Sequence, residues 1–266
     1  MSIVSNGFDH ASQTAALHAF GEGALASPSV GNAEPYSDSQ ISHHSGLPLV
    51  MAARFPQRVA MTPARRVRLA VKRALDILLS GLALLGLLPL FMLVALAILC
   101  ESRGPVIFRQ YREGVHGRLF PAFKFRSMRV ESCDASGLAH TRADDDRITR
   151  VGRFLRRTSI DELPQLLNVF LGHMSLVGPR PHVPNMQAGG QTYKDLVPYY
   201  DERLAMLPGL TGWAQANGYR GDASDPGLAK ARVDHDMAYI QNFSLLLDLR
   251  IVLITLQREF LSGNGN

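Results

Sequence analysis

Two adjacent acidic residues, Asp161 and Glu162, are the first candidates for chemistry in this sequence of 266 residues. A carboxylate can attack a phosphorus centre as a nucleophile or bind a divalent metal ion. Pro164 is tolerated in a helix only within the first turn, so we expect a helix that begins between Ser159 and Asp161. The unpaired N–H groups of a helix start bind phosphate. The segment that precedes the two acids in the sequence contains four basic residues, Arg150, Arg153, Arg156 and Arg157.

A carboxylate beside a phosphate repels it unless a metal ion intervenes or the carboxylate is itself the nucleophile. The pair therefore predicts a site that processes a phosphate. A purely structural role is the alternative, in which Asp161 caps the helix and Glu162 stabilises its first turn. Adjacent helical residues point about 100° apart, so the two acids need not perform the same task.

Two further segments carry candidate phosphate-binding cations. Pro179 and Pro181 flank Arg180 after a predicted strand. A stiff backbone lowers the entropy that Arg180 loses when it grips a phosphate, although an arginine in an ordinary turn is the alternative. Lys124 and Arg126 lie in the segment KFRSM, the basic end of a second predicted strand. This segment is weak evidence on its own.

The charge of the chain is unevenly distributed. Its net charge is +5, yet residues 1–53 contain no Lys or Arg, so all 28 basic residues lie in 54–266. A basic body indicates an anionic partner, which could be nucleic acid, anionic lipid or a phosphorylated substrate. The two cysteines, Cys100 and Cys133, exclude a disulfide framework and a four-cysteine zinc site.

Residues 74–100 form an apolar run in which positions 77–100 carry no charge. As a helix these 24 residues measure about 36 Å, enough to cross a bilayer core of about 30 Å. Positive residues mark the cytoplasmic side of a membrane segment, but here they stand at both ends of the run. Before it lie Arg65, Arg66, Arg68, Lys72 and Arg73, and after it lie Arg103, Arg109, Arg112 and Arg118.

Pro89 lies near the middle of the uncharged stretch, where a proline kinks a helix. A helix that enters the membrane, bends at Leu88–Pro89 and leaves by the same face satisfies both observations. A kinked spanning helix is the alternative. The carbonyl groups freed at the bend need partners, because lipid offers none.

Three parts are predicted along the chain: a disordered leader (1–62), a basic flank with the re-entrant membrane helix (63–103), and a cytoplasmic domain (104–262). The fold class is α/β (α+β), mostly helical, with interfacial amphipathic helices. The predicted elements are a hairpin (106–108 and 119–125), a loop (131–146), helices (147–157, 159–172, 196–207 and 245–260), a strand running into a turn (174–181) and a glycine-rich irregular segment (208–221).

The sequence resembles the bacterial sugar transferase family, the monotopic polyprenyl-phosphate phosphoglycosyl transferases that start exopolysaccharide and O-antigen repeat units. Four segments carry the resemblance, in the order of the family: KFRSM, RITRVGRFLRRTSIDELPQLLNV, MSLVGPRP and PGLTGWAQANGYRG. It covers about residues 68–260. The resemblance implies a membrane helix broken near a proline, and several relatives have a serine where this chain has Leu88.

The family reaction moves a sugar 1-phosphate from a UDP-sugar to undecaprenyl phosphate and releases UMP. By resemblance Asp161 is the nucleophile that forms an aspartyl phospho-sugar, and Glu162 binds Mg²⁺ beside it. The implied phosphate and nucleotide contacts are Arg156 and Arg180, and Lys124 is another active-site cation. The predicted substrate-binding residues are Lys124, Arg126, Arg156, Pro179, Arg180 and Pro181. We expect the nearby arginines to lower the pKa of Asp161.

The resemblance places the protein at the bacterial inner membrane, with the catalytic domain in the cytoplasm and inner-membrane lipid as a partner. It implies the first membrane step of exopolysaccharide synthesis, with glucose or galactose as the sugar. An inactive membrane-anchored scaffold is the alternative. A nucleic-acid binder is not expected, because no recognition motif supports one. An interfacial C-terminal helix is compatible with a homodimer.

Overall fold

The structure is a computed structural model, and it describes residues 59–130, 145–219 and 225–261. Every described residue belongs to one compact unit within His44–Asn266. Nearly all of the predicted leader and most of the predicted loop at 131–146 lie outside the described residues.

The apolar run forms two helices, α2 (Pro63–Gly86) and α3 (Leu88–Glu101), bent by 59° at Leu87. Pro89 lies in the first turn of α3, where its missing N–H group costs no helical hydrogen bond. The predicted break near Leu88–Pro89 is therefore confirmed, as a boundary between two helices. Within the described residues no helix is by itself long and apolar enough to cross a bilayer, whereas α2 and α3 taken together meet that length and composition.

One face of α2 is polar and buried, and its members are Arg65, Lys72, Asp76 and Ser80. The Arg65 guanidinium donates to the carbonyl of Ile240, and Lys72 pairs with Asp248 at 2.6 Å. Their position before the apolar run predicted that these basic residues mark the membrane topology. The structure gives Arg65 and Lys72 an additional role, because they fasten α2 to the rest of the domain.

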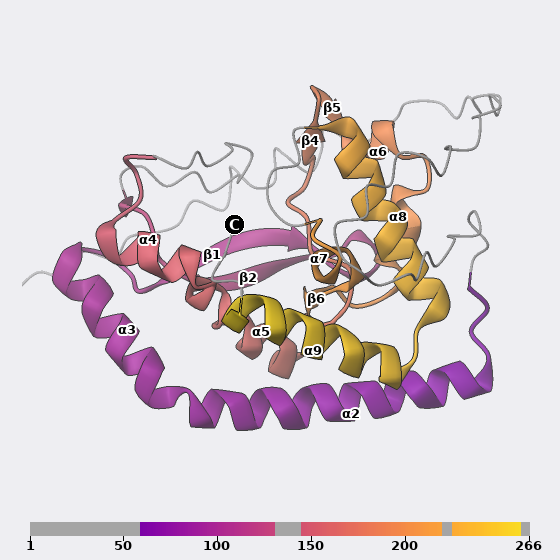
Figure 1. The fold of residues 1–266 in the computed structure, drawn as a ribbon, viewed down its shortest axis with the longest axis horizontal. Coiled ribbons are helices and arrows are strands. Elements are labelled where there is room, and N and C mark those ends of the chain that lie inside the picture. The colour runs from indigo at the N-terminus through magenta and orange to yellow at the C-terminus, as the bar shows by residue number, and fades with distance from the viewer. Residues whose placement is uncertain (1–58, 131–144, 220–224, 262–266) are drawn as a thin grey trace, which may run out of the picture. The chain divides into compact units, whose positions relative to one another are not determined.

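The other face of α2 is apolar and exposed, and it includes Val67, Val71, Leu75, Leu78, Leu82 and Leu85. Figure 1 shows α2 running along one side of the domain beside α5 (Gln165–Leu171) and α9 (Leu245–Leu261). Exposed leucines continue on these two helices, at Leu167, Leu171, Leu246, Leu249, Leu253 and Leu256.

The predicted hairpin is present and longer than expected. Strand β1 (Ile107–Glu113) pairs antiparallel with β2 (Leu119–Phe125), with Ile107 opposite Phe125. A turn at η3 (Val115–Gly117) joins the strands. The Asn168 side chain on α5 accepts from the main chain of Phe123 and donates to that of Pro121, and so attaches α5 to β2.

A short parallel pair, β3 (Ser175–Val177) and β6 (Gly209–Thr211), forms a second sheet. Its strands are joined closely through glycines: a Cβ atom on Gly209 would lie 2.1 Å from the main-chain nitrogen of Gly178. The prediction that 208–221 is irregular was wrong. That segment contains β6 and the short helix α7 (Trp213–Ala216), because its glycines permit the backbone to approach β3.

The remaining elements are α4 (Arg150–Arg157), η5 (Ile160–Glu162), β4 (Gln187–Ala188), β5 (Gln191–Thr192), α6 (Tyr193–Leu196), η6 (Tyr200–Ala205) and α8 (Pro226–Asn242). The described residues are mostly helical with small sheets, as predicted. Two helices were predicted wrongly: 159–172 is a 3₁₀ turn followed by the short α5, and much of 196–207 is the 3₁₀ segment η6. Helix α8 was not predicted, and it packs in the main core through Val233 and Tyr239.

Candidate active site

Glu162 lies at the centre of a group of charged side chains drawn from three elements. Its Oε1 atom accepts a hydrogen bond from Lys124 Nζ on β2 at 2.8 Å. The same oxygen accepts from Arg180 Nη2, in the segment after β3, at 3.0 Å. The three side chains that the sequence named separately thus form one ion-paired cluster.

Asp161 is buried beside this cluster, in η5, which follows a sharp reversal of the chain after α4. The reversal passes through Ser159, which has φ 55 in the left-handed region that non-glycine residues seldom adopt. Helix caps do not explain Asp161: the N-cap of η5 is Ser159, that of α5 is Pro164, and neither helix has a side-chain capping bond. The capping alternative for Asp161 is therefore wrong.

The two neighbouring carboxylates have opposite electrostatic environments. Burial raises the pKa of Asp161, and the charge of Glu162 adds to this, although Lys124 and Arg156 act against it. Burial alone would also raise the pKa of Glu162, but Arg180 and Lys124 outweigh that effect and hold it well below its usual range. The expectation that arginines lower the pKa of Asp161 was wrong, because desolvation is the larger effect. Carboxylates whose pKa values are pushed apart are suited to different roles.

The four arginines of helix α4 differ in their exposure. Arg156 is partly buried and acts electrostatically on Asp161. The other three, Arg150, Arg153 and Arg157, are exposed together with Phe154. The helix begins against the end of α3, since the Glu101 carboxylate accepts from the main-chain N–H groups of Arg150 and Val151 at 2.6 and 2.9 Å.

Arg126 does not join the cluster. Strand β2 ends at Phe125, and the buried Arg126 guanidinium donates to the carbonyls of Ser102 and Arg103 at 2.6 and 2.7 Å. These contacts give Arg126 a structural role at the end of α3, and its binding of substrate stays a prediction.

Pro179 and Pro181 hold the main chain on either side of Arg180. The Pro179 carbonyl accepts from the N–H of Gly209 at 2.9 Å. The Pro181 carbonyl accepts from Arg112 Nη1, on β1, at 3.0 Å. These contacts fix the loop from which Arg180 reaches Glu162.

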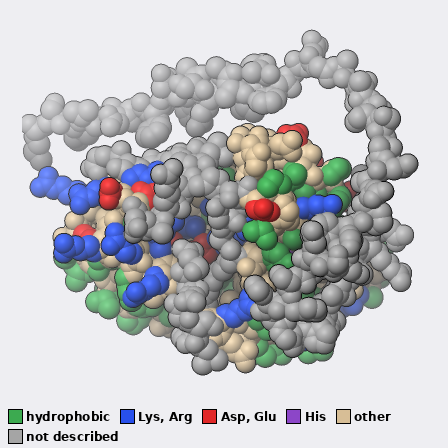
Figure 2. All heavy atoms as spheres, turned by 45° about the horizontal axis from the view of Figure 1, so that its top comes forward, with side chains coloured by type: hydrophobic (Ala, Val, Ile, Leu, Met, Phe, Trp, Pro, Cys, Tyr) green, Lys and Arg blue, Asp and Glu red, His purple; other side chains and the backbone are tan. Residues whose placement is uncertain are grey.

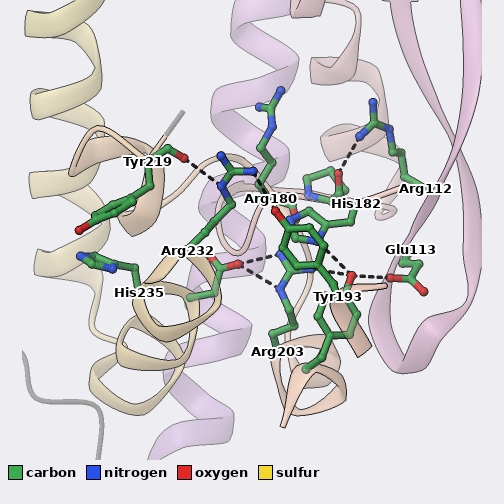
Figure 3. Close-up of polar contacts among 12 residues, drawn as sticks. Arg112, Glu113, Arg180, His182, Tyr193, Arg203, Tyr219, Arg232 and His235 are labelled. Carbon is green, nitrogen blue, oxygen red and sulfur yellow. Dashed lines mark hydrogen bonds and ion pairs between the residues drawn. The ribbon is translucent and has the colours of Figure 1, made fainter. Parts of the chain in front are cut away.

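Sequence reasoning missed a buried polar group behind Arg180, which Figure 3 shows. Its members include Arg112, Glu113, His182, Tyr193, Tyr200, Arg203 and Asp236. Arg203 and Asp236 form an ion pair at 2.7 Å with both side chains 1% exposed. The only signal in the sequence is an arginine followed by the apolar run LAML, which is too common to identify a buried pair.

The candidate ligands for a divalent cation at this site are the carboxylates of Asp161 and Glu162. Among the described residues no group of three or more His, Cys, Asp or Glu side chains could hold a metal ion. Mg²⁺ is commonly bound through one or two carboxylates together with substrate phosphates. The hard oxygen atoms of Asp161 and Glu162 fit that mode, with Glu162 Oε1 already taken by Lys124 and Arg180.

Comparison with known proteins places the chain in a family. The family model described as bacterial sugar transferase matches residues 67–262. The chain is 52% identical over 197 residues to the exopolysaccharide production protein PSS of Rhizobium leguminosarum bv. phaseoli, covering 74% of this chain and 98% of that protein. It is 50% identical over 194 residues to the undecaprenyl-phosphate glucose phosphotransferase of Komagataeibacter xylinus, covering 73% of this chain and 36% of that protein.

A third relative has a different named sugar. The chain is 41% identical over 196 residues to the UDP-N-acetylgalactosamine-undecaprenyl-phosphate N-acetylgalactosaminephosphotransferase of Aeromonas hydrophila, covering 73% of this chain and 44% of that protein. The chain thus spans nearly all of the Rhizobium protein and less than half of the other two. The resemblance that the four segments indicated is confirmed, and the chain belongs to the bacterial sugar transferase family.

Proposed function

We propose that the protein transfers a hexose 1-phosphate from a UDP-sugar to undecaprenyl phosphate and releases UMP, as the first membrane step of exopolysaccharide synthesis. The observation that carries the proposal is the buried Asp161 beside a Glu162 that Lys124 and Arg180 hold ionised. The names of the Komagataeibacter and Aeromonas relatives, which specify transfer of a sugar phosphate to undecaprenyl phosphate, support the substrates.

The proposed reaction has two displacements at one phosphorus atom. In the first, an ionised Asp161 oxygen attacks the phosphorus that carries the sugar, and the bond to the bridging oxygen of UMP breaks. UMP leaves with that electron pair, and an aspartyl phospho-sugar remains. In the second, an oxygen of undecaprenyl phosphate attacks the same phosphorus and the bond to Asp161 breaks, which restores the carboxylate and yields a lipid diphosphate sugar.

The cations around the acids suit this charge flow. Arg180, Lys124 and Arg156 surround the position where negative charge develops on the phosphate oxygens, and preorganised cations stabilise such charge. The raised pKa of Asp161 preserves more nucleophilicity than a strongly acidic carboxylate would have. The low pKa of Glu162 keeps it charged for its own role.

We also propose that Mg²⁺ is the cofactor. The remaining oxygen of Glu162 and the phosphate oxygens of the donor would hold it, with Asp161 close by. When bound, the ion supplies neutralisation of the diphosphate charge and assists the departure of UMP. Lys124 and Arg180 meanwhile orient the Glu162 carboxylate through its Oε1 atom.

The bent helix pair supports a re-entrant arrangement in the bacterial inner membrane with a cytoplasmic catalytic domain. Both ends of the pair contact the same folded unit: Arg65, near the start of α2, donates to the Ile240 carbonyl, and Glu101, the last residue of α3, accepts from the main chain at the start of α4. A spanning pair would place its two ends on opposite sides of the bilayer, which these contacts oppose.

The exposed surface favours the same placement. Figure 2 shows basic side chains gathered at the left of the view, with hydrophobic side chains below them. Helix α4, which carries the exposed arginines, contacts α3, whose exposed apolar side chains include Leu93, Leu96 and Leu99. An apolar surface edged by basic residues suits the boundary between lipid tails and anionic headgroups.

The direct test is UMP release by purified protein in detergent from UDP-glucose, UDP-galactose and UDP-N-acetylgalactosamine, with and without added polyprenyl phosphate. We expect lipid-stimulated release from one of the two hexose donors, with Asp161→Asn as the inactive control. Release from UDP-N-acetylgalactosamine alone would overturn the choice of a hexose. Failure with every donor would favour the inactive scaffold.

A further inference from the structure

Arg203 is buried behind Arg180 and bonds its main chain. Arg203 lies in η6 with 2% of its surface exposed. Its Nη2 atom donates to the Arg180 carbonyl at 2.5 Å. The same guanidinium donates to a single oxygen of Asp236, on α8, from Nε at 3.0 Å and from Nη2 at 2.7 Å. Arg203 therefore connects a fixed carboxylate on one helix to the main chain of the loop that carries Arg180 (Figure 3).

A second, partly buried arginine bonds the next carbonyl in the loop. Arg112 on β1 donates to Pro181, so the carbonyls of residues 180 and 181 are each held by a guanidinium from a different element. Two flanking prolines restrict the φ angles of the same loop. Arg180 projects from this restrained main chain to Glu162, which lies 3.0 Å from its Nη2 atom.

The chemistry of the guanidinium explains why this position suits arginine. A planar guanidinium offers donors in a fixed fork, so the direction set by Asp236 also sets the direction toward the Arg180 carbonyl. A lysine ammonium at the same place would keep the charge but could not hold both partners in that plane. Net stability does not require the pair, since buried ion pairs are often no more stabilising than apolar residues of similar volume.

We infer that Arg203, oriented by Asp236, is a positioning residue for the transfer reaction: it fixes the main chain at Arg180 so that the Arg180 guanidinium meets Glu162 and the donor phosphate. This inference rests on the proposed function, because that function assigns Arg180 to the donor. Arg203 and Asp236 touch no substrate in this assignment and act through Arg180 alone.

The test compares Arg203→Lys with Tyr200→Phe in the full-length protein, after both variants pass a gel-filtration and thermal-unfolding check. Tyr200 lies in the same buried group, donates to Glu113 at 2.7 Å and accepts from Arg203 Nη1 at 3.3 Å, but it does not bond Arg180. Tyr200→Phe therefore leaves in place the bonds of Arg203 to Asp236 and to the Arg180 carbonyl. We expect Arg203→Lys to raise the KM for the UDP-sugar at least fivefold and to lower kcat at least tenfold, with the KM for polyprenyl phosphate unchanged. Tyr200→Phe should stay within twofold of the wild type.

A loss of correctly folded protein lowers apparent kcat but leaves KM unchanged, so the donor KM separates positioning from a structural role. The second readout is a double-mutant cycle. In an Arg180→Ala background, Arg203→Lys should change activity by less than twofold, because the group through which it acts is gone. If Arg203→Lys misfolds, Asp236→Glu takes its place, since it retains the charge and displaces the guanidinium.

Two results would overturn the positioning role and leave the proposed reaction intact. One is that the Arg203 or Asp236 variant loses the same fraction of activity in the wild-type and the Arg180→Ala backgrounds. The other is a donor KM that the variant leaves unchanged. An Arg180→Ala variant with wild-type constants would instead overturn the role of Arg180 in the proposed function, and the positioning role with it. Absence of UMP release by the wild type would reject the proposed function itself.

Discussion

Asp161 and Glu162 are neighbours in the chain, yet their surroundings give them different chemistry. Glu162 has two cations on one oxygen, whereas Asp161 has burial as its dominant influence. Glu162 is poorly placed to attack the donor phosphorus, because the attack would break its contacts with Lys124 and Arg180. The acid with the raised pKa is the better nucleophile, and this difference underlies the first prediction.

Asp161→Asn should abolish both turnover and the exchange of labelled UMP into UDP-sugar in the absence of lipid, because an amide is a very poor nucleophile. Glu162→Gln should lower both rates by about 10²-fold or more, since it removes a charge that orders Lys124 and Arg180. The measurement is radiolabel exchange in detergent. Lipid-dependent turnover by Asp161→Asn, or exchange that strictly requires lipid, would indicate direct transfer without a covalent intermediate.

His182 supplies a pH-dependent contribution to stability. Tyr200 donates its proton to Glu113, so the contact between Tyr200 and His182 Nδ1 at 3.0 Å requires the imidazole to be the donor. The buried Nε2 atom has no partner in the described part of the chain, so no neighbouring group stabilises a proton on it. Burial, reinforced by Arg203 and Arg232, holds the pKa of His182 well below its usual value.

Because the folded protein binds this proton less readily than the unfolded chain, stability is fully present above pH 6.5 and falls as the pH drops below it. The loss is about 1.4 kcal/mol per pH unit until the folded pKa is reached. His182→Asn can still donate to Tyr200 but does not titrate. We expect it to lower the unfolding temperature at pH 7.5 and to flatten the decline between pH 7 and pH 5.5. An equally steep decline in the variant would exclude His182 as its source.

At the scale of elements, the bend between α2 and α3 was predictable and the docking of α2 was not. Pro89 breaks the helix for a local reason that the sequence contains. Asp76 and Ser80 lie within or beside the apolar run, and only tertiary structure reveals that Asp76 accepts hydrogen bonds from Ser175 and Leu176. The 3₁₀ segment at Tyr200–Ala205 was also not predicted, because its composition is that of an α-helix and the burial of Arg203 against Asp236 depends on tertiary packing.

The orientation of this helix pair gives the third prediction. Single cysteines at Ala64 and Pro105, in a variant with Cys100 and Cys133 replaced by serine, should both be protected from an impermeant thiol reagent in intact cells. Both positions are exposed on the domain and lie at opposite ends of the pair. Opened membranes provide the control, in which both cysteines should react. Labelling of one position alone from outside would indicate a spanning helix.

At the scale of the molecule, the site is built from segments that lie far apart in the chain and were predicted one by one. Lys124, Glu162 and Arg180 were each named from local sequence, and the structure brings them within hydrogen-bonding distance. What could not be predicted is the support behind them. Arg112 and Arg203 differ from surface arginines only through burial and partners, which depend on the packing of β1, η6 and α8.

The exposed leucines of α2, α5 and α9 give the last prediction, which concerns how the whole domain meets lipid. A leucine that enters an interface contributes roughly 1.5–3 kcal/mol when fully buried, and a charge in its place is excluded from the apolar layer. Leu249 on α9 is 55% exposed and Leu228 on α8 is 49% exposed, so the same substitution at each makes a matched pair.

Leu249→Glu should raise the KM for polyprenyl phosphate in nanodiscs at least threefold, because it displaces the domain from the lipid that carries the acceptor. Leu228→Glu should leave that KM unchanged. Exchange of UMP into UDP-sugar needs no lipid and should be the same in both variants, which separates a loss of lipid contact from damage to the site. Equal acceptor KM values in the two variants would show that α9 does not face the membrane.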